Sequence, residues 1–400
     1  MKNISSESSF AGNLSSAFKK VALQALLGAI LLALGPSCSR VATPVAPEPP
    51  EASAPKAPAV ILLIGDGMGL SILSAAMQNS RTPLAMETMP VVGFHKTYSY
   101  TDRVTDSAAG ATAFSCGIKT YNNSIGMGPD SLPCYTILEE AEDRGLATGL
   151  VATSSIVHAT PAAFIAHETM RTSNEGIAAD FLDTAVDILI GGGKRYFDRR
   201  EEDDRNLVAE MGFKGYVVRD YFDSSLDKIS IDPKRKFVFF TADSQPVSVS
   251  QGRNYLSYAT RLATEFLDRH TDKGFFLMIE GSQIDWANHG NEGRLAVQET
   301  LDFDRAVGEA LAFAQKRGNT LVIVTADHET GGVALVPDAR SGKPGIAYCT
   351  NAHTAAMAPV LAFGPGAEAF AGIYENTAIY HKMRAFLQFD KSVPSIGETY

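Results

Sequence analysis

The stretch ILLIGDGMGL, residues 61–70, runs four apolar residues into three glycines placed around Asp66. A glycine loop behind a buried strand can bind phosphate, and in the dinucleotide fingerprint it reads G-x-G-x-x-G or ends in Ala. Position 70 is Leu, and no strand ending in an acid follows about twenty residues later, as that fingerprint requires. We therefore expect the glycines to allow a tight turn, so that Asp66 itself is the ligand.

Apolar segments typical of buried strands recur along the chain and alternate with helical segments. The predicted strands cover residues 60–64, 148–152, 187–190, 236–240, 275–279, 321–325 and 360–363. The predicted helices cover residues 108–116, 135–144, 254–269 and 294–316. Continuous apolar strands separated by helices favour a parallel sheet covered on both faces. The sequence thus predicts one α/β domain over residues 59–400, with a mainly parallel central sheet sandwiched between helices.

The first 58 residues do not share this pattern. An apolar run of 14 residues, 21–34, follows Lys19 and Lys20 and precedes Cys38. This pattern predicts an export signal over residues 1–38. Two outcomes stay open: lipidation of Cys38, as in bacterial lipoproteins, or ordinary cleavage that releases a soluble secreted protein. Residues 39–58 are rich in Pro and Ala and predict an extended linker. We expect an exported protein, periplasmic or at the cell surface, with Cys38 as its membrane anchor.

Charge and cysteine content narrow the classes of function. The net charge of −10 and the lack of a basic stripe do not favour a nucleic-acid partner. An acidic chain that handles an anionic substrate needs local positive charge, which bound metal ions can supply. The cysteines of the folded part, Cys116, Cys134 and Cys349, lack the spacing of a thiolate zinc site. Export permits a disulfide, but the sequence leaves the pairing open.

Residues whose side-chain oxygen or nitrogen atoms can bind a metal ion follow four of the predicted strands. In chain order they are Asp66, His158 with Thr160, Glu280 with Asp285 and His289, and Asp327 with His328; His353 lies in the next loop. In parallel sheets ligands bind at the carboxyl ends of the strands, so these side chains are expected to converge. They are the ligand types that hold Zn²⁺ and Mg²⁺. One such residue is usually structural, but charges placed repeatedly behind buried strands favour a metal cluster.

Two further residues suit phosphate chemistry. In VTDSAAGATAFSCGIKT, residues 104–120, Asp106 and Ser107 open a predicted helix, whose N-terminus attracts anions. A serine there is often only a cap, and no GxSxG motif surrounds it. Beside metal cations, however, it can act as a nucleophile without a histidine base. The guanidinium of Arg171 suits phosphate because it donates paired hydrogen bonds, although a surface salt bridge is an equally ordinary role.

As a set, these segments resemble the alkaline phosphatase family. The matching segments are IGDGMG (64–69), TDSAAGATA (105–113), HATPAAFIAH (158–167) with Arg171, EGSQIDWANH (280–289), TADHETGG (325–332) and NAHT (351–354). They occur in family order and span the folded part. The resemblance implies a metal-dependent phosphomonoesterase of broad substrate range and alkaline optimum, acting on small phosphate monoesters through a phosphoserine at Ser107.

The resemblance also implies two zinc ions and one magnesium ion. The implied ligands are Asp285, His289 and His353 for the first zinc, Asp327, His328 and Asp66 for the second, and Asp66, Thr160 and Glu280 for magnesium. Arg171 is then the phosphate clamp, oriented by Asp106. His158 and Trp286 flank the magnesium, where some members carry Asp and Lys. A neutral Trp286 predicts weaker phosphate binding, and direct binding by His158 would shift the third site from Mg²⁺ toward Zn²⁺.

Assembly and reaction class are less narrowly determined by the sequence. Only 24 residues separate His328 from His353, so the large crown insertion of some members is missing and the oligomeric state, including a homodimer, stays open. A phosphodiesterase of the same superfamily is one alternative, although such relatives usually carry a threonine nucleophile. A sulfatase is disfavoured because Ser107 lacks the Cys/Ser-x-Pro-x-Arg context. The remaining alternative is a non-catalytic zinc- or phosphate-binding surface protein.

Overall fold

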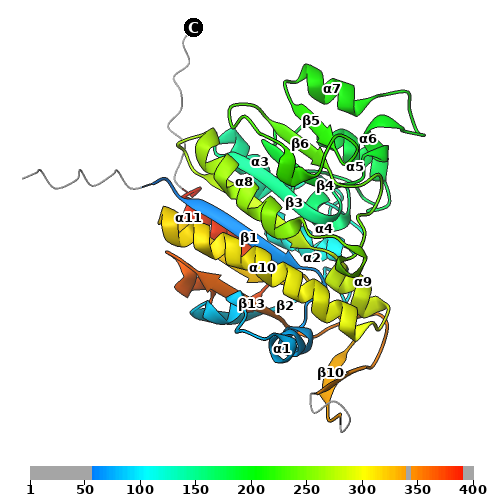
Figure 1. Cartoon of the computed structure of the whole chain (residues 1–400), viewed down its shortest axis with the longest axis vertical. Coiled ribbons are helices and arrows are strands. Elements are labelled where there is room, and N and C mark those ends of the chain that lie inside the picture. The colour runs from blue at the N-terminus through cyan, green and yellow to red at the C-terminus, as the bar shows by residue number, and fades with distance from the viewer. Residues whose placement is uncertain (1–55, 339–343, 391–400) are drawn as a thin grey trace, which may run out of the picture. The chain divides into compact units, whose positions relative to one another are not determined.

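The computed structural model describes residues 56–338 and 344–390, and a ten-stranded sheet forms its centre (Figure 1). In spatial order the strands are β14 (Gly372–Glu375), β2 (Val91–Lys96), β13 (Ala358–Phe363), β8 (Thr320–Thr325), β1 (Ala59–Gly65), β7 (Phe275–Gly281), β3 (Ala147–Ser155), β4 (Ile188–Gly192), β6 (Phe237–Phe240) and β5 (Val217–Asp220). Within this sheet only β13 is antiparallel to its neighbours, β2 and β8. The predicted mainly parallel sheet is confirmed.

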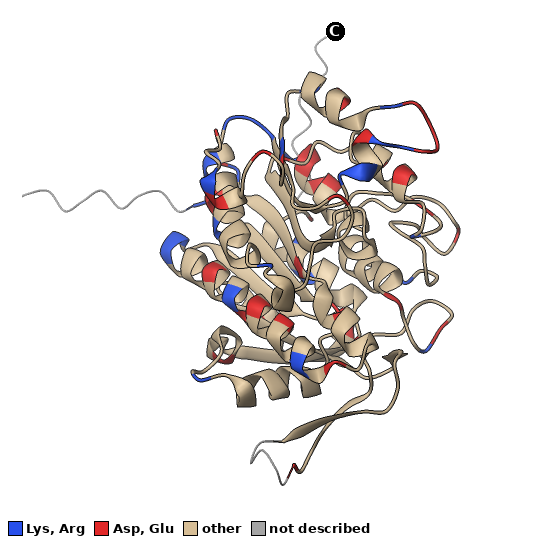
Figure 2. Ribbon diagram, turned by 45° about the vertical axis from the view of Figure 1, so that its right-hand side comes forward, with Lys and Arg blue, Asp and Glu red and all other residues tan. Residues whose placement is uncertain are grey.

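Alternate residues of the central strands face two separate hydrophobic cores. In β1, Val60, Leu62 and Ile64 belong to one core, and Ile61 and Leu63 to the other. The central strands are almost free of charged residues, as Figure 2 shows. Both faces of the sheet are therefore buried, which explains the continuous apolar runs of the sequence.

Helices cover both cores. The core of Val60 is covered by α2 (Ser107–Cys116), α3 (Ile137–Asp143), α4 (Ala159–Ala162), α5 (Asn174–Asp180), α6 (Arg195–Asp198), α7 (Leu207–Phe213), η4 (Ala367–Phe370) and α11 (Thr377–Leu387). The core of Ile61 is covered by α1 (Leu70–Asn79), η1 (Ala85–Thr88), η2 (Leu226–Lys228), α8 (Leu256–His270), α9 (Gln283–His289) and α10 (Gly293–Arg317). A short helix, η3 (Val249–Gln251), precedes α8.

Two small sheets form beyond the carboxyl end of β8. Strand β9 (Glu329–Thr330) pairs with β12 (His353–Thr354), and β10 (Val333–Val336) pairs with β11 (Gly345–Tyr348). Figure 1 shows β10 extending away from the central sheet. Strands β9, β10 and β11 lie between His328 and His353, and β12 begins at His353.

All seven predicted strands and all four predicted helices are present, with ends that differ by a few residues. The central sheet also contains β2, β5 and β14, which the sequence did not predict. These strands lie at or next to the sheet edges and are only partly buried, so they lack a continuous apolar run. Of the three cysteines of the folded part, Cys116 and Cys134 form a disulfide, and Cys349 is free and exposed.

Several predictions concern residues that are not described. The export signal at residues 1–38, with Cys38, and residues 39–55 of the linker lie outside the described part, as do residues 391–400 of the predicted domain. Within the described part, no helix combines the length and apolarity that a membrane span requires.

Candidate active site

The turn after β1 places Asp66 among the ends of neighbouring strands. Gly67 has a φ of +67°, and a Cβ at this position would lie 2.8 Å from Asp285 Oδ1 and from Thr330 Oγ1. Its backbone N–H donates to Asp327 Oδ1 over 3.1 Å. A side chain at residue 67 would therefore both strain the backbone and collide with the site. The glycine is needed so that Asp66, which is fully buried, can lie against these groups.

The predicted ligands converge into three groups whose potential ligand atoms lie within 4.8 Å of one another. The groups are Asp285 with His289 and His353, Asp66 with Asp285 and His328, and Asp66 with His158 and Glu280. The first equals the ligand set implied for the first zinc. The second contains Asp285 where the resemblance implied Asp327, but Asp327 Oδ2 lies only 3.1 Å from His328 Nε2. The third contains His158 beside Asp66 and Glu280.

Short-range geometry fixes the orientation of several of these ligands. Asp285 and His289 lie one turn apart on α9, and their side chains are 3.3 Å apart. The strand pair of β12 with β9 brings His353 to the same place, with 3.0 Å between the Nε2 atoms of His353 and His289. The other ring nitrogen of His353 lies 2.9 Å from the carbonyl oxygen of Thr105. The imidazole rings therefore have fixed positions, as metal ligands usually do.

Four buried carboxylates share this site, and their electrostatics favour cations. Burial and the neighbouring acids Asp327 and Asp285 raise the pKa of Asp66 well above its usual range. Burial raises the pKa of Glu280 to about 7. Burial opposes ionisation of Asp327 too, but the adjacent His328 lowers its pKa. Carboxylates packed this closely repel one another in a low dielectric, so bound metal ions would supply the missing positive charge.

Buried polar atoms without a partner supply an independent test of the metal ligands. Among the described residues, Thr160 Oγ1, His158 Nδ1 and Glu280 Oε1 are buried without a hydrogen bond. Glu280 Oε2, in contrast, accepts hydrogen bonds from Ser282 Oγ over 2.6 Å and from Ser154 Oγ over 3.2 Å. Unpaired buried oxygen and nitrogen atoms are costly unless a cation binds them. These atoms fit the hard to borderline ligand sets of Mg²⁺ and Zn²⁺.

Ser107 is the first residue of α2, and its hydroxyl lies inside the cluster. Asp106, not Ser107, caps the helix, because its Oδ1 accepts from the N–H of Ala109 over 3.0 Å. Ser107 Oγ lies 3.4 Å from both carboxylate oxygens of Asp66 and 3.2 Å from His328 Nε2. A capping role therefore does not account for Ser107. Its position is that of a nucleophile held beside metal ligands.

Arg171 is only partly buried and belongs to the same site. Its Nη1 is 3.1 Å from Asp106 Oδ2, and its Nη2 is 3.3 Å from His158 Nε2. The ring of Trp286 meets the ring of His158 edge to face, with centroids 5.7 Å apart. Burial and Arg171 lower the pKa of His158 to about 3, so its imidazole is neutral and able to bind a metal. Arg171 therefore contacts residues of the site rather than forming a separate surface salt bridge.

The sequence did not identify the hydroxyl groups that support the ligands. Thr330 Oγ1 donates to Asp285 Oδ1 and lies 3.2 Å from His328 Nδ1, while Ser282 and Ser154 hold Glu280. Ser282 and Thr330 lie inside the matched segments EGSQIDWANH and TADHETGG, which is a usable signal. A lone hydroxyl residue such as Ser154 has no signature that separates it from an ordinary loop residue.

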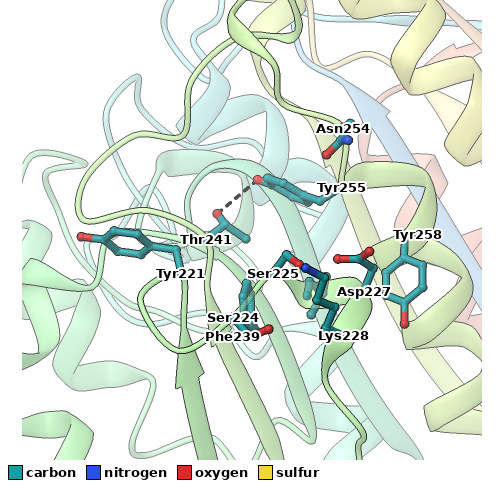
Figure 3. A pocket seen from close by; sticks show the side chains of 11 residues that line it. Tyr221, Ser224, Ser225, Asp227, Lys228, Phe239, Thr241, Asn254, Tyr255 and Tyr258 are labelled. Atoms are coloured by element: carbon teal, nitrogen blue, oxygen red, sulfur yellow. Dashed lines mark hydrogen bonds between the residues drawn. The ribbon is translucent and has the colours of Figure 1, made fainter.

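A separate hollow of about 650 Å³ lies at the carboxyl ends of β5 and β6. Figure 3 shows Tyr255 in its wall, and Thr241 Oγ1 donates to the Tyr255 hydroxyl over 3.3 Å. Phe239 and Leu226, which also line it, belong to the core under α8, whereas α2 covers the other core. The hollow and the helix that bears Ser107 therefore lie on opposite faces of the sheet.

Comparison with known proteins gives one consistent family. A family model described as alkaline phosphatase matches residues 57–343. Alkaline phosphatase 3 of Bacillus subtilis is 42% identical over 294 aligned positions, and the alignment covers 70% of this chain and 62% of that protein. The chain thus spans less than two thirds of that relative. The alkaline phosphatase of Escherichia coli is 32% identical over 407 residues, covering 82% of this chain and 85% of that protein.

A solved structure covers nearly the same part of the chain. The alkaline phosphatase of the Antarctic bacterium TAB5 superposes with a TM-score of 0.80 and 43% identity over 84% of this chain and 100% of that chain. A variant of that protein with a histidine replaced by aspartate was solved with Mg bound in a site named M3.

Proposed function

The chain belongs to the alkaline phosphatase family, and from this premise we propose that it hydrolyses phosphate monoesters to an alcohol and inorganic phosphate. One observation carries the proposal: the hydroxyl of Ser107 lies between Asp66 and His328, inside a cluster of metal-ligand types. A protein that only bound zinc or phosphate would have no use for a nucleophile at this point.

The cofactors in this proposal are two zinc ions and one magnesium ion. The zinc ligands are Asp285, His289 and His353 for one ion and Asp66, Asp327 and His328 for the other; the magnesium ligands are Asp66, Thr160 and Glu280, with His158 as a further ligand at that site. When bound, the ions supply positive charge that lowers the pKa of a nearby hydroxyl and neutralises charge on the transferring phosphoryl group.

The proposed reaction consists of two successive displacements at phosphorus. Ser107 Oγ gives up its proton to solvent and attacks phosphorus, the bond to the alcohol oxygen breaks, that oxygen takes up a proton from solvent, and phosphoserine forms. Water then loses a proton and attacks the same phosphorus, the bond to Ser107 Oγ breaks, Ser107 Oγ is protonated again, and inorganic phosphate is released. The N-terminus of α2 presents backbone N–H groups and the positive end of the helix dipole to the phosphoryl oxygens.

Arg171 supplies the selectivity for monoesters. Its guanidinium can donate paired hydrogen bonds to two unesterified oxygens, and Asp106 holds it in place. A phosphodiester has only two unesterified oxygens in all, and its second alcohol group would have to occupy the remaining position beside the metals. This favours a monoesterase over a phosphodiesterase, and an ionisable nucleophile predicts activity that rises toward alkaline pH.

The test is to trap the phosphoserine. Metal-replete protein is mixed with p-nitrophenyl phosphate at acidic pH, quenched, and analysed for phosphate on Ser107 by mass spectrometry, with Ser107→Ala as the control. We expect phosphate on Ser107 and none in the variant. Absence of trapped phosphate and of turnover would favour a binding protein, and faster cleavage of bis(p-nitrophenyl) phosphate would favour a phosphodiesterase.

We also propose that the protein is exported and anchored through a lipid on Cys38. The proposal rests on the sequence of residues 1–38 alone. Mass spectrometry of protein from a native membrane fraction tests it, because lipidation adds acyl mass to a peptide that begins at Cys38. An unmodified mature protein in the soluble fraction would contradict it.

A further inference from the structure

A pocket of about 450 Å³ lies beside the candidate active site, and nothing in the mechanism uses it. We call it the cationic pocket, and it is lined by Lys96, Thr97, Tyr98, Arg103, Ala355 and Met357. Lys96 ends β2 at the same edge of the sheet as the carboxyl ends of β8 and β1, because β2 runs parallel to them. The pocket therefore opens at the edge where the catalytic groups gather.

Both segments that form the pocket continue directly into the active site. Arg103 precedes Ser107 by four residues, which places their Cα atoms at most about 14 Å apart. Ala355 follows His353 by two residues, and His353 Nδ1 lies 2.9 Å from the carbonyl oxygen of Thr105. Thr97 Oγ1 donates to the carbonyl oxygen of Ala356 over 3.1 Å, which joins the two lining segments. Its walls are thus tied to the segments of the nucleophile and of a metal ligand.

The charged groups around the pocket are mostly positive. Lys96 Nζ lies 2.7 Å from Glu375, and Lys119 Nζ lies 3.3 Å from the same carboxylate, so one acid faces two lysines. Arg103 is exposed and has no hydrogen bond or ion pair within residues 56–338 and 344–390. The acid nearest to it along the chain is Asp102, which is also exposed. With three cations (Lys96, Lys119 and Arg103) and two acids (Asp102 and Glu375) ionised, the local charge is positive, although the net charge of the chain is −10.

We propose that the cationic pocket binds a second anionic group on the alcohol portion of the substrate, so that monoesters whose leaving group carries another phosphate or carboxylate are preferred. The proposal rests on the proposed phosphatase function and names its substrate class. Arg103 supplies a free guanidinium fork for anionic oxygens, and Lys96, which is paired with Glu375, also lines the pocket.

The alternative is that these cations only attract every anionic substrate from solution. Such steering acts on all anions and weakens at physiological salt, whereas a binding pocket acts only on substrates long enough to reach it. A length series of substrates can therefore separate the two. Linear diols of three to six carbons, each as the monophosphate and as the bisphosphate, present the same reacting group with and without the second anion.

The experiment compares kcat/KM for each pair, per phosphate, in wild type, Arg103→Gln and Lys96→Gln. The control is Arg81→Gln, because Arg81 is also exposed but does not line the cationic pocket. We expect wild type to prefer the bisphosphate at one spacer length. Arg103→Gln should reduce that preference by about tenfold, the usual effect of losing one charge-assisted hydrogen bond, and leave the monophosphate unchanged. Arg81→Gln should match wild type.

Equal rates for the two esters in wild type at every length would overturn the proposal. So would an Arg103→Gln variant that loses activity equally on both esters, since that result indicates steering. If wild type hydrolyses no monophosphate, the proposed function itself fails. In that case calorimetry with Ser107→Ala tests the cationic pocket separately. Tighter binding of the bisphosphate than of the monophosphate would support the proposal if Arg103→Gln abolishes the difference. Equal binding of the two esters would refute it.

Discussion

The carboxylate of Asp106 joins Arg171 to α2, the helix that bears Ser107: one oxygen caps α2 through the N–H of Ala109, and the other lies 3.1 Å from Arg171. The backbone N–H of Asn123 donates to that second oxygen as well, over 3.0 Å. One side chain therefore sets the position of both groups that are expected to contact phosphate.

Replacing Asp106 should separate these two roles. Asp106→Ala removes the bonds to Ala109, Asn123 and Arg171, so we expect the inhibition constant for inorganic phosphate to rise by about tenfold and the free energy of unfolding to fall by about 1 kcal/mol. Asp106→Asn keeps a capping oxygen but turns an amide toward Arg171, so it should weaken phosphate binding with little loss of stability. Steady-state inhibition and urea unfolding measure the two effects. Unchanged inhibition in both variants would show that Asp106 does not hold the clamp.

Trp286 should control how tightly phosphate binds. The neutral ring lies against His158, which in turn lies 3.3 Å from the guanidinium of Arg171. Trp286→Lys would add a positive charge near the phosphate, so we expect the inhibition constant for inorganic phosphate to fall by about tenfold, as for one added charge-assisted contact. Trp286→Phe keeps the site neutral and serves as the control. The idea fails if the lysine variant binds phosphate no more tightly than the phenylalanine variant.

Removal of metal ions should destabilise the protein. Without cations, Asp66, Glu280, Asp285 and Asp327 are buried together, and their repulsion is uncompensated. Ions at a thousandfold excess over their dissociation constant add about 4 kcal/mol, so dialysis against a chelator should lower the Tm and added Zn²⁺ and Mg²⁺ should restore it. Glu280→Gln should melt higher than wild type when both are metal-free and gain less from Mg²⁺. A Tm that does not change after dialysis against the chelator would contradict the assignment of these residues as metal ligands.

The disulfide between Cys116 and Cys134 should stabilise the fold. It closes a loop of 18 residues at the end of the helix that bears Ser107, and loops of that length add about 3 kcal/mol to the free energy of unfolding. We expect Cys116→Ser with Cys134→Ser to lose about that amount in denaturant unfolding, and Cys349→Ser to lose almost nothing. Among these three cysteines only Cys349 should react with an alkylating agent in the native protein. Equal labelling of all three would contradict the pairing.

The pair of His167 and Glu139 should give a pH-dependent contribution to stability. Their side chains lie 3.0 Å apart, and although burial opposes it, the hydrogen bond to Glu139 raises the pKa of His167 above its usual value. A raised histidine pKa stabilises the fold fully below the unfolded value of about 6.5, and this stability is lost as the pH rises through the folded pKa. His167→Gln should therefore lose about 1 kcal/mol at pH 6 and clearly less at pH 9. An equal loss at both pH values would rule out an ionic contribution.

The convergence of the ligands could be predicted from the sequence because parallel strands end at one edge. In the register of β1 with β7, Ile64 pairs with Glu280, so Asp66 and the residues after Glu280 leave the sheet side by side. Similarly, Ala152 of β3 pairs with Glu280, which brings the segment of His158 and Thr160 to the third group. Local patterns were sufficient here because the strand ends alone determine the neighbours.

Other features depend on contacts between segments that have no local pattern. The edge strand β14 and the neighbouring β2 are partly exposed and short, so only their pairing partners identify them as strands. The position of Asp285 in two of the three groups follows from the way α9 packs, not from its spacing to His289. Likewise, Arg103 and Met357 lie 254 positions apart and line one pocket only because the chain folds.

The short pairing of β9 with β12 has a consequence for protein engineering. Because His353 pairs directly with Thr330 and Gly345 with Val336, the chain runs out along β10 and back along β11, and this excursion starts and ends at the same place. The entropy of closing such a loop rises slowly, by about 0.6 kcal/mol for each doubling of its length. A foreign peptide or a whole domain grafted into this excursion should leave the metal ligands on either side in place. The position therefore offers a point at which a sensor or affinity module can be built into the enzyme.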